Sequence, residues 1–237
     1  YVLSEEEIAV TIGKVDEVVE IELVNYFIKG NIALTKVDED YPDNKLSGAV
    51  FEVYSDTNGD GKLDKDDTLL GEMKELDGGV YQMSELRYGK YLVKETKAPT
   101  GFVLDENVYS VSVEENGKTY TVENKAGVGF INAAQKGSLK IVKTSSDGKV
   151  EGFSFRVTGV DYDQTFKTDK NGEIVIEGLR IGDYTVSEVS DKASAGYILP
   201  ADKQATVKVD ATAIVQMHNE FRDTPKTGDD FNLGLWV

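Results

Sequence analysis

Two triplets of reactive side chains recur in the same order along the chain. They are Lys36, Glu95, Asn132 and Lys143, Glu188, Asn219. A neutral lysine amine can attack the side-chain amide carbon of an asparagine, expel ammonia and leave an isopeptide crosslink. A protonated glutamic acid can hydrogen-bond the amide oxygen, polarise it and then shuttle protons. For half of the lysine amines to be neutral at pH 7, the lysine pKa must fall by about 3.4 units, which corresponds to about 4.6 kcal/mol. Burial among apolar groups can supply a shift of this size.

The positions of these residues within alternating segments indicate which way they point. Ile32 and Leu34 share a strand face with Lys36, and Tyr91 and Val93 share one with Glu95. The second triplet has the same pattern. Because side chains two apart on a strand point to the same side, the charged groups face inward if the apolar ones do. The alternative interpretation is that these strand ends place the charges at a solvent edge.

Short alternating segments separated by turn dipeptides run along the whole chain. The clearest predicted strands are residues 49–54, 109–113, 139–143, 153–157 and 205–209. Asn-Gly and Asp-Gly pairs between such segments favour hairpins. No segment sustains a 3.6-residue apolar period for more than about two turns. The pattern predicts an all-β protein built of Ig-like β-sandwiches.

The chain also repeats itself. The segment 86–95 (LRYGKYLVKE) aligns with 179–188 (LRIGDYTVSE), and 30–36 aligns with 137–143. The repeat predicts one domain over residues 30–135 and another over 136–222. Residues 1–29 match only the last strands of a unit, so we interpret them as the end of a truncated preceding domain. The short joints between units favour a semi-rigid rod, with residues 223–237 as a tail.

Composition excludes several classes of function. The formal net charge of −17 argues against binding to nucleic acid or to an anionic membrane surface. The chain has no cysteine and a single histidine, His218, which removes disulfides and thiol chemistry and nearly excludes a histidine-based triad or metal cluster. No nucleophile–base pair or redox motif is visible. We therefore expect no enzyme beyond a single-turnover crosslinking reaction.

One longer motif carries a resemblance to a known family. Residues 91–102 (YLVKETKAPTGF) resemble the pilin E-box, Tyr-x-Leu-x-Glu-Thr-x-Ala-Pro-x-Gly-Tyr, with Val93 and Phe102 as departures. The chain is similar to the Cna B-type domains of Gram-positive surface adhesins and pilins, which are also called SpaA-like or prealbumin-like. The second unit keeps Tyr184, Glu188 and Tyr197 but lacks Thr-x-Ala-Pro. The resemblance implies tandem prealbumin-like sandwiches.

The resemblance also assigns roles to the two triplets. It implies isopeptide bonds from Lys36 to Asn132 and from Lys143 to Asn219, with Glu95 and Glu188 as proton shuttles. Asn25 is then the acceptor of the truncated preceding domain, and we expect it to be unreacted. Each crosslink would join the first and last strands of its unit, so that a pulling force loads a covalent bond.

A twelve-residue acidic loop makes the first unit longer than the second. Its residues follow the spacing of a calcium-binding loop. The predicted ligands are Asp56, Asn58, Asp60, Lys62 (through its backbone carbonyl), Asp64 and Asp67. Gly61 stands at the sixth position, where such loops turn sharply. The spacing predicts a weak Ca²⁺ site of the extracellular type. The alternative is an acidic hairpin loop with ordinary Asn-Gly and Asp-Gly turns.

The tail carries a second resemblance. Thr224, Pro225, Lys226, Thr227 and Gly228 resemble the sortase signal Leu-Pro-x-Thr-Gly, with Thr in place of Leu. The motif implies cleavage after Thr227, covalent attachment to peptidoglycan, and contact with a membrane only through a C-terminal segment that is then removed. The alternative is an ordinary tail.

Together these observations predict an extracellular, cell-wall-anchored stalk of a Gram-positive adhesin or pilin. Two alternatives stay open. One is a module that binds a carbohydrate or a host protein through its loops, and the other is a set of accessory domains of a larger surface enzyme.

Overall fold

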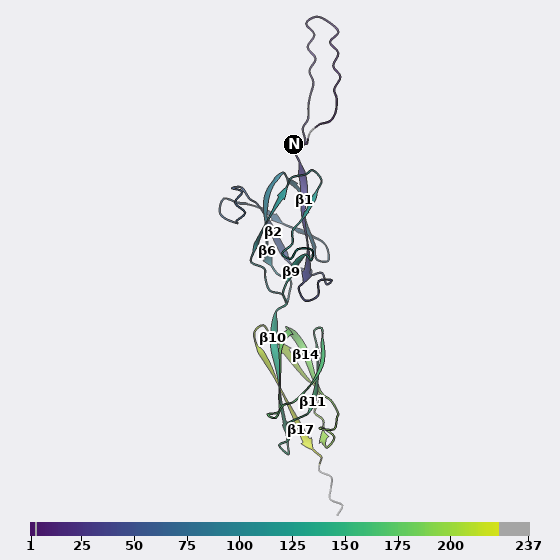
Figure 1. Ribbon diagram of the computed structural model, residues 1–237, viewed down its shortest axis with the longest axis vertical. Helices are drawn as coiled ribbons and strands as arrows, with labels where there is room; N and C mark the ends of the chain where they lie inside the picture. Colours follow the sequence, from purple (N-terminus) through teal and green to yellow (C-terminus); the bar gives the residue numbers. More distant parts are fainter. Residues whose placement is uncertain (3, 223–237) are drawn as a thin grey trace, which may run out of the picture. The chain divides into compact units, whose positions relative to one another are not determined.

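The computed structural model describes residues 1–2 and 4–222. These residues form strands and turns, and none of them belongs to a helix long and apolar enough to cross a membrane. The chain divides into two compact units, with the boundary between Ala134 and Gln135. Each unit contains two facing β-sheets (Figure 1), which confirms the predicted all-β sandwich fold.

The described residues of the first unit form nine strands. They are β1 (Lys29–Asp38), β2 (Val50–Ser55), β3 (Thr68–Glu72), β4 (Lys74–Asp77), β5 (Val80–Arg87), β6 (Gly89–Lys97), β7 (Val108–Val113), β8 (Thr119–Thr121) and β9 (Phe130–Asn132). One sheet has the order β4-β5-β1-β8, and β9 also pairs with β1. The other sheet has the order β3-β2-β6-β7. The first strand β1 therefore pairs in parallel with the last strand β9.

The second unit repeats this topology with eight strands between residues 135 and 222. They are β10 (Lys136–Ser145), β11 (Ser154–Gly159), β12 (Tyr162–Lys167), β13 (Glu173–Arg180), β14 (Gly182–Glu188), β15 (Tyr197–Ile198), β16 (Lys203–Val207) and β17 (Thr212–Phe221). The sheets have the orders β13-β10-β17-β15 and β12-β11-β14-β16. Here too the first strand, β10, pairs in parallel with the last, β17.

A separate apolar core lies between the two sheets of each unit. In β1, buried and half-buried residues alternate, with Ile32 and Leu34 on the buried side. Phe51 of β2 and Phe130 of β9 meet edge to face in the first core, with ring centroids 4.9 Å apart. Phe153 and Tyr197 meet in the same manner in the second core. The alternation read from the sequence therefore places the inward faces correctly.

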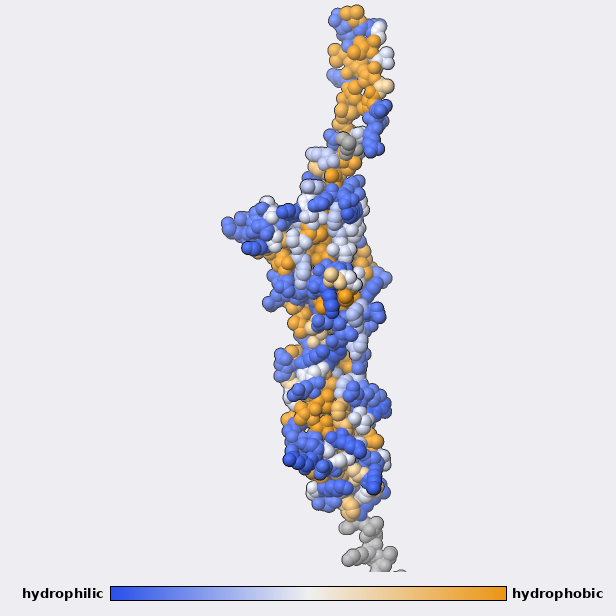
Figure 2. Space-filling model, viewed as in Figure 1, coloured by the Kyte–Doolittle hydropathy of each residue, from blue (hydrophilic) through white to orange (hydrophobic). Residues whose placement is uncertain are grey.

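Residues 1–28 differ from the two sandwiches. The described residues before Lys29 form no regular strand, although the backbone amide of Val2 donates to the carbonyl of Tyr26. Many of their apolar side chains are exposed, among them Ile12 and Val15. Figure 2 shows this apolar surface along the long open loop that Figure 1 draws at the N-terminal end. The strands predicted there lack the sheet against which their apolar faces would pack.

Candidate functional site

The site of the first unit joins three strands (Figure 1). Lys36 comes from β1, Glu95 from β6 and Asn132 from β9. In the parallel ladder Lys36 lies opposite Phe130, so Asn132, two residues further along β9, is its diagonal neighbour on the same face. Glu95 lies opposite Phe51 in the other sheet. The sandwich therefore brings the three side chains together between its two sheets.

Burial of this site is nearly complete. Lys36 and Glu95 are 0% exposed, and Asn132 is 3% exposed. This excludes the alternative in which the charged strand ends lie at a solvent edge. Apolar rings line the site, and the Lys36 Nζ lies 5.5 Å from the centroid of the Phe130 ring. A charged amine and a carboxylate in such surroundings are costly unless they are paired or neutralised.

Hydrogen bonds orient the three groups. Asn132 Nδ2 donates to Glu95 Oε1 at 2.9 Å and to Oε2 at 3.0 Å, and Lys36 Nζ donates to the carbonyl of Phe130 at 3.0 Å. Asn132 Oδ1 is buried and has no hydrogen-bond partner among the described residues. An amide oxygen in this state can accept a proton from a neutral carboxylic acid beside it.

The electrostatics of the first site favour neutral groups. Burial lowers the pKa of Lys36 to about 8, although the charges of Glu95, Asp105 and Asp38 oppose this shift. Burial raises the pKa of Glu95, while hydrogen bonds from the Asp105 amide and Asn132 and the charge of Lys36 act in the opposite direction. The two shifts make a neutral amine beside a protonated acid more accessible than in water.

The second unit builds the same arrangement with the same register. Lys143 of β10 lies opposite Met217 of β17, so Asn219 is again the diagonal neighbour two residues further on. Glu188 of β14 lies opposite Phe155 of β11, as Glu95 lies opposite Phe51 in the first unit. Two sequences that differ at most positions thus place the same three groups at the same points of the sandwich.

Contacts in the second site differ in detail. Asn219 Nδ2 donates to Glu188 Oε1 at 2.6 Å, and Lys143 Nζ donates to the carbonyl of Thr144 at 2.6 Å. Lys143 Nζ also lies 4.3 Å from the centroid of the Phe153 ring. Burial lowers the pKa of Lys143 and raises that of Glu188, with the mutual attraction of the two groups opposing both shifts.

Sequence reasoning missed one polar network beside the first site. Asp105 donates its backbone amide to Glu95 Oε2 at 2.8 Å. Its carboxylate accepts hydrogen bonds from Tyr109 at 2.6 Å and from Asn124 at 2.8 Å. Burial alone would raise the pKa of Asp105, but these bonds and those from Asn107 outweigh it and lower the pKa. No motif marks these residues, because the key donor is a backbone group.

The predicted calcium loop folds onto its own amides. Asp56 accepts hydrogen bonds from the amides of Gly59 at 2.7 Å and Gly61 at 3.1 Å, and Asp67 accepts one from the amide of Asp64 at 2.9 Å. Within the described residues, no group of three or more His, Cys, Asp or Glu side chains is placed to hold a metal ion. The carboxylates would have to turn toward a common centre to bind one, so the Ca²⁺ site stays a prediction.

Two other predicted features lie apart from the buried sites. Asn25, the predicted acceptor of the preceding domain, is exposed. The predicted sortase signal, residues 224–228, lies outside the described residues.

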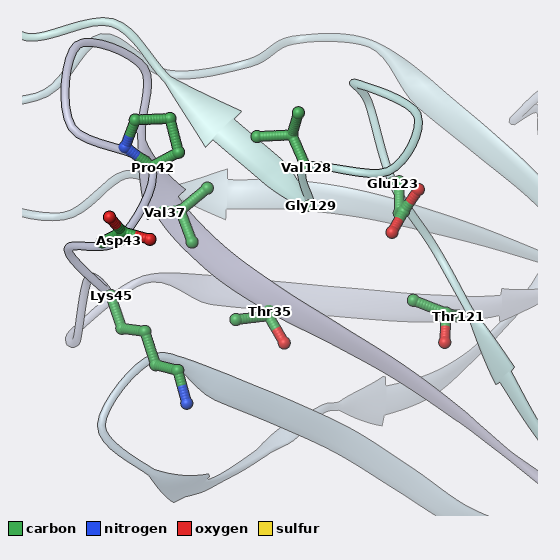
Figure 3. Close-up of a pocket in the computed structure, with 9 residues that line it drawn as sticks. All are labelled: Thr35, Val37, Pro42, Asp43, Lys45, Thr121, Glu123, Val128 and Gly129. Carbon is green, nitrogen blue, oxygen red and sulfur yellow. The ribbon is translucent and has the colours of Figure 1, made fainter.

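A pocket in the first unit lies on the outer side of β1 (Figure 3). Thr35 and Val37 line it, and they flank Lys36, whose side chain points to the opposite face. Charges of both signs, from Asp43, Lys45 and Glu123, surround the pocket. It is therefore separate from the lysine site, and its mixed charges favour no particular ligand.

Comparisons with known proteins agree with this architecture. The sequence model of the SpaA family, described as a prealbumin-like fold domain, matches residues 30–126 and 137–221. No curated protein matches the chain. Among solved structures, the Bacillus anthracis TIE protein is similar at 24% identity and a TM-score of 0.60, over 82% of this chain and 34% of that one. The pilus adhesin SpaC of Lactobacillus rhamnosus GG is similar at 14% identity and a TM-score of 0.50, over 82% of this chain and 31% of that one.

These structural similarities concern the fold alone, and the chain spans about a third of the length of each of those two proteins. The family match confirms the prealbumin-like fold that the resemblance implied.

Proposed function

Because the chain belongs to the SpaA family of prealbumin-like fold domains, we propose that it is part of the stalk of a surface adhesin or pilin and that each sandwich closes itself with a Lys–Asn isopeptide bond. One observation carries this proposal. The same lysine, glutamate and asparagine are gathered between the sheets of both units, in the same strand register. Domains of this family are generally not enzymes, and the crosslinking is a single-turnover reaction of the chain on itself.

The reaction in the first unit starts from a neutral Lys36 amine and a protonated Glu95. Glu95 donates a proton to Asn132 Oδ1 while Lys36 Nζ attacks Asn132 Cγ, which gives a tetrahedral intermediate. Glu95 then takes a proton from the attacking nitrogen and delivers one to the leaving Nδ2. The C–N bond to Nδ2 breaks as the proton on Oδ1 returns to Glu95, so that the carbonyl is restored, ammonia departs, and Lys36 Nζ stays bonded to Cγ. The second unit uses Lys143, Glu188 and Asn219 in the same roles.

The position of the crosslink suits a protein under tension. In the first unit it would join β1 to β9, the first and last strands, which already pair in parallel. A force that enters through one end of the unit and leaves through the other must then stretch a covalent bond before it can separate the strands. The chain has no cysteine with which to achieve the same closure.

Intact mass in denaturant tests the proposal directly. Two crosslinks remove two ammonia molecules, so the measured mass should be about 34 Da below that calculated from the sequence. The variants Lys36→Met and Lys143→Met should each show a deficit of about 17 Da relative to their own calculated masses. A wild-type chain of unmodified mass would rule the crosslinks out.

Anchoring to the cell wall is a further part of the proposal. The segment Thr224–Gly228 resembles a sortase signal, so a sortase would cleave after Thr227 and attach the chain to peptidoglycan outside a Gram-positive cell. Incubation with purified sortases and an amino nucleophile should then release residues 228–237, as seen by mass. An intact chain with every sortase class tried would contradict the anchoring proposal, and Thr227→Ala is the matched control.

Calcium binding by the loop from Asp56 to Asp67 is a separate, secondary proposal. It is supported by the spacing of the five oxygen-bearing side chains, Asp56, Asn58, Asp60, Asp64 and Asp67. A resident Ca²⁺ would neutralise the loop's carboxylates and tie its backbone in place.

A further inference from the structure

The fully buried Glu95 and the half-buried Glu188 differ by one hydrogen-bond donor. In the first unit Glu95 Oε2 accepts the backbone amide of Asp105 at 2.8 Å. In the second unit Glu188 Oε2 is inaccessible to solvent and has no hydrogen-bond partner among the described residues. Asn219 Oδ1 is also buried and unpartnered. A proton on Glu188 Oε2 would make that oxygen a donor, and Asn219 Oδ1 is an acceptor that lacks one.

A proline stands in the second unit at the position equivalent to the donor residue of the first unit. Phe102 pairs with Ala134, two residues after Asn132, and Tyr197 pairs with Phe221, two residues after Asn219. Phe102 and Tyr197 are therefore equivalent. Three residues beyond each of them, the first unit has Asp105 and the second has Pro200. Proline has no backbone N–H, so position 200 cannot supply the bond that position 105 supplies.

The charged groups around the two glutamates are otherwise well matched. Glu95 faces the amine of Lys36 and has the Asp105 carboxylate nearby. Glu188 faces the amine of Lys143 and has the Asp191 carboxylate nearby. Each site thus has one cation that favours the ionised glutamate and one anion that disfavours it. Among these hydrogen bonds and charges, the Asp105 amide is the one contact of Glu95 that has no counterpart at Glu188, while Glu95 is the more buried of the two.

We propose that Asp105 and Pro200 are positioning residues that set the proton affinity of the two catalytic glutamates. The Asp105 amide favours the ionised carboxylate of Glu95. Pro200 has no N–H to donate, so Glu188 holds its proton more firmly. As a statement about crosslinking, this rests on the proposed function; as a statement about the proton, it stands on the contacts alone. A backbone N–H aimed at a carboxylate stabilises its ionised form, and its removal shifts the pKa upward by about one unit.

The consequence for crosslinking follows from the proton balance within each pair. The reactive state, an amine beside a carboxylic acid, exchanges with the unreactive state, an ammonium beside a carboxylate, by moving one proton. Losing the hydrogen bond from the backbone amide destabilises the carboxylate form of the glutamate and leaves the other three forms unaffected. A shift of about one pKa unit therefore raises the ratio of the reactive to the unreactive pair about tenfold. Because Pro200 lacks the N–H that Asp105 donates in the first unit, it favours the reactive, neutral pair of Lys143 and Glu188.

Carbon-13 NMR titration of the glutamate side-chain carboxyl groups tests the inference. The background is the full chain with Lys36→Met and Lys143→Met, which cannot crosslink and lacks both amines. Pro200→Ala restores an N–H at a half-exposed position and should lower the pKa of Glu188 by about one unit, with that of Glu95 unchanged.

A matched pair of variants tests the first unit. Asp105→Asn and Asp105→Pro both remove the carboxylate, but only the proline also removes the N–H. The pKa of Glu95 should be about one unit higher in Asp105→Pro than in Asp105→Asn. The proline is compatible with this backbone, because Pro200 occupies the equivalent place in the second unit.

Two results would overturn the inference: a Glu188 pKa that Pro200→Ala does not lower, or equal Glu95 pKa values in the two Asp105 variants. Failure of the proposed function is a different result. It would appear as an unmodified mass of the wild-type chain, and the titrations would still decide where the protons are held.

Discussion

Replacing Glu95 by glutamine separates the chemistry of the first site from its packing. Glutamine has nearly the same shape, and its oxygen, placed where Glu95 Oε2 lies, can still accept from Asn132 Nδ2 and from the Asp105 amide, the two donors that hold Glu95. It cannot give a proton to Asn132 Oδ1 or take one from Lys36. We therefore expect Glu95→Gln to fold with the same core and to leave Lys36 and Asn132 unlinked.

The size of the stability loss follows from the length of chain that the bond closes. The crosslink spans the 97 residues from Lys36 to Asn132. By the chain-entropy relation for disulfides, closing a loop of this length stabilises a fold by about 4.7 kcal/mol through the unfolded state. For a domain of about 100 residues, each kcal/mol shifts the melting temperature by about 4 °C or more. The first unit of Glu95→Gln should therefore melt about 20 °C lower.

Intact mass and differential scanning calorimetry measure the two effects on the same sample. Glu95→Gln should keep a deficit of about 17 Da, and proteolysis should place the remaining bond between Lys143 and Asn219. One transition should move down while that of the second unit stays in place. Glu72→Gln, which changes an exposed carboxyl on β3, is the control and should behave as wild type. A Glu95→Gln chain with the full deficit would refute the role of Glu95, and loss of the bond without a lower melting temperature would refute the closure argument.

Three further predictions concern other parts of the chain. Burial lowers the pKa of Lys36 from 10.5 to about 8, and Asn132→Ala keeps this lysine free because it cannot crosslink. The unfolded state then holds more protons between those values, so urea titrations should show the first unit gaining up to about 3 kcal/mol as pH rises from 8 to 10.5. Adding Lys36→Met should abolish the gain. Gly137→Ala would place a Cβ 2.1 Å from the carbonyl oxygen of Lys208, so the second unit should lose about 2 kcal/mol or more in thermal unfolding. Calorimetric titration with Ca²⁺ should give heat that Asp56→Ala removes, and an equal heat in both would contradict the loop site.

The sandwich could be predicted from the sequence because two independent patterns agree. Alternation identifies the inward face of each strand, and the repeat shows that two segments have the same fold. The prediction of a strand at 139–143 falls inside β10, and that of 153–157 overlaps β11. Residues 1–28 also alternate, yet no regular strand forms among those that the structure describes. A strand requires a partner ladder, and alternation alone cannot show whether one is present.

The candidate site could be predicted in part for the same reasons. Periodicity places Lys36 and Glu95 on inward faces, and their recurrence in the second unit argues against chance. Periodicity says nothing about register, however. Only the ladder shows that Lys36 lies opposite Phe130, with Asn132 two residues further on the same face. A shift of one residue in this pairing would have turned Asn132 toward solvent.

The two sites differ in a backbone hydrogen bond to the glutamate, and residue patterns in the sequence do not predict such a bond. Every non-proline residue carries a backbone amide, so the letter at position 105 does not reveal that its N–H points at Glu95. The proline at position 200 is visible in the sequence, but its effect depends on which carboxyl group lies where the missing donor would have pointed. An alignment of the two repeats therefore shows that the reactive side chains are retained, but it does not show that the proton affinity of the glutamate can differ between them. Comparisons among such domains gain from aligning the backbone donors around the glutamate as well as the three reacting residues.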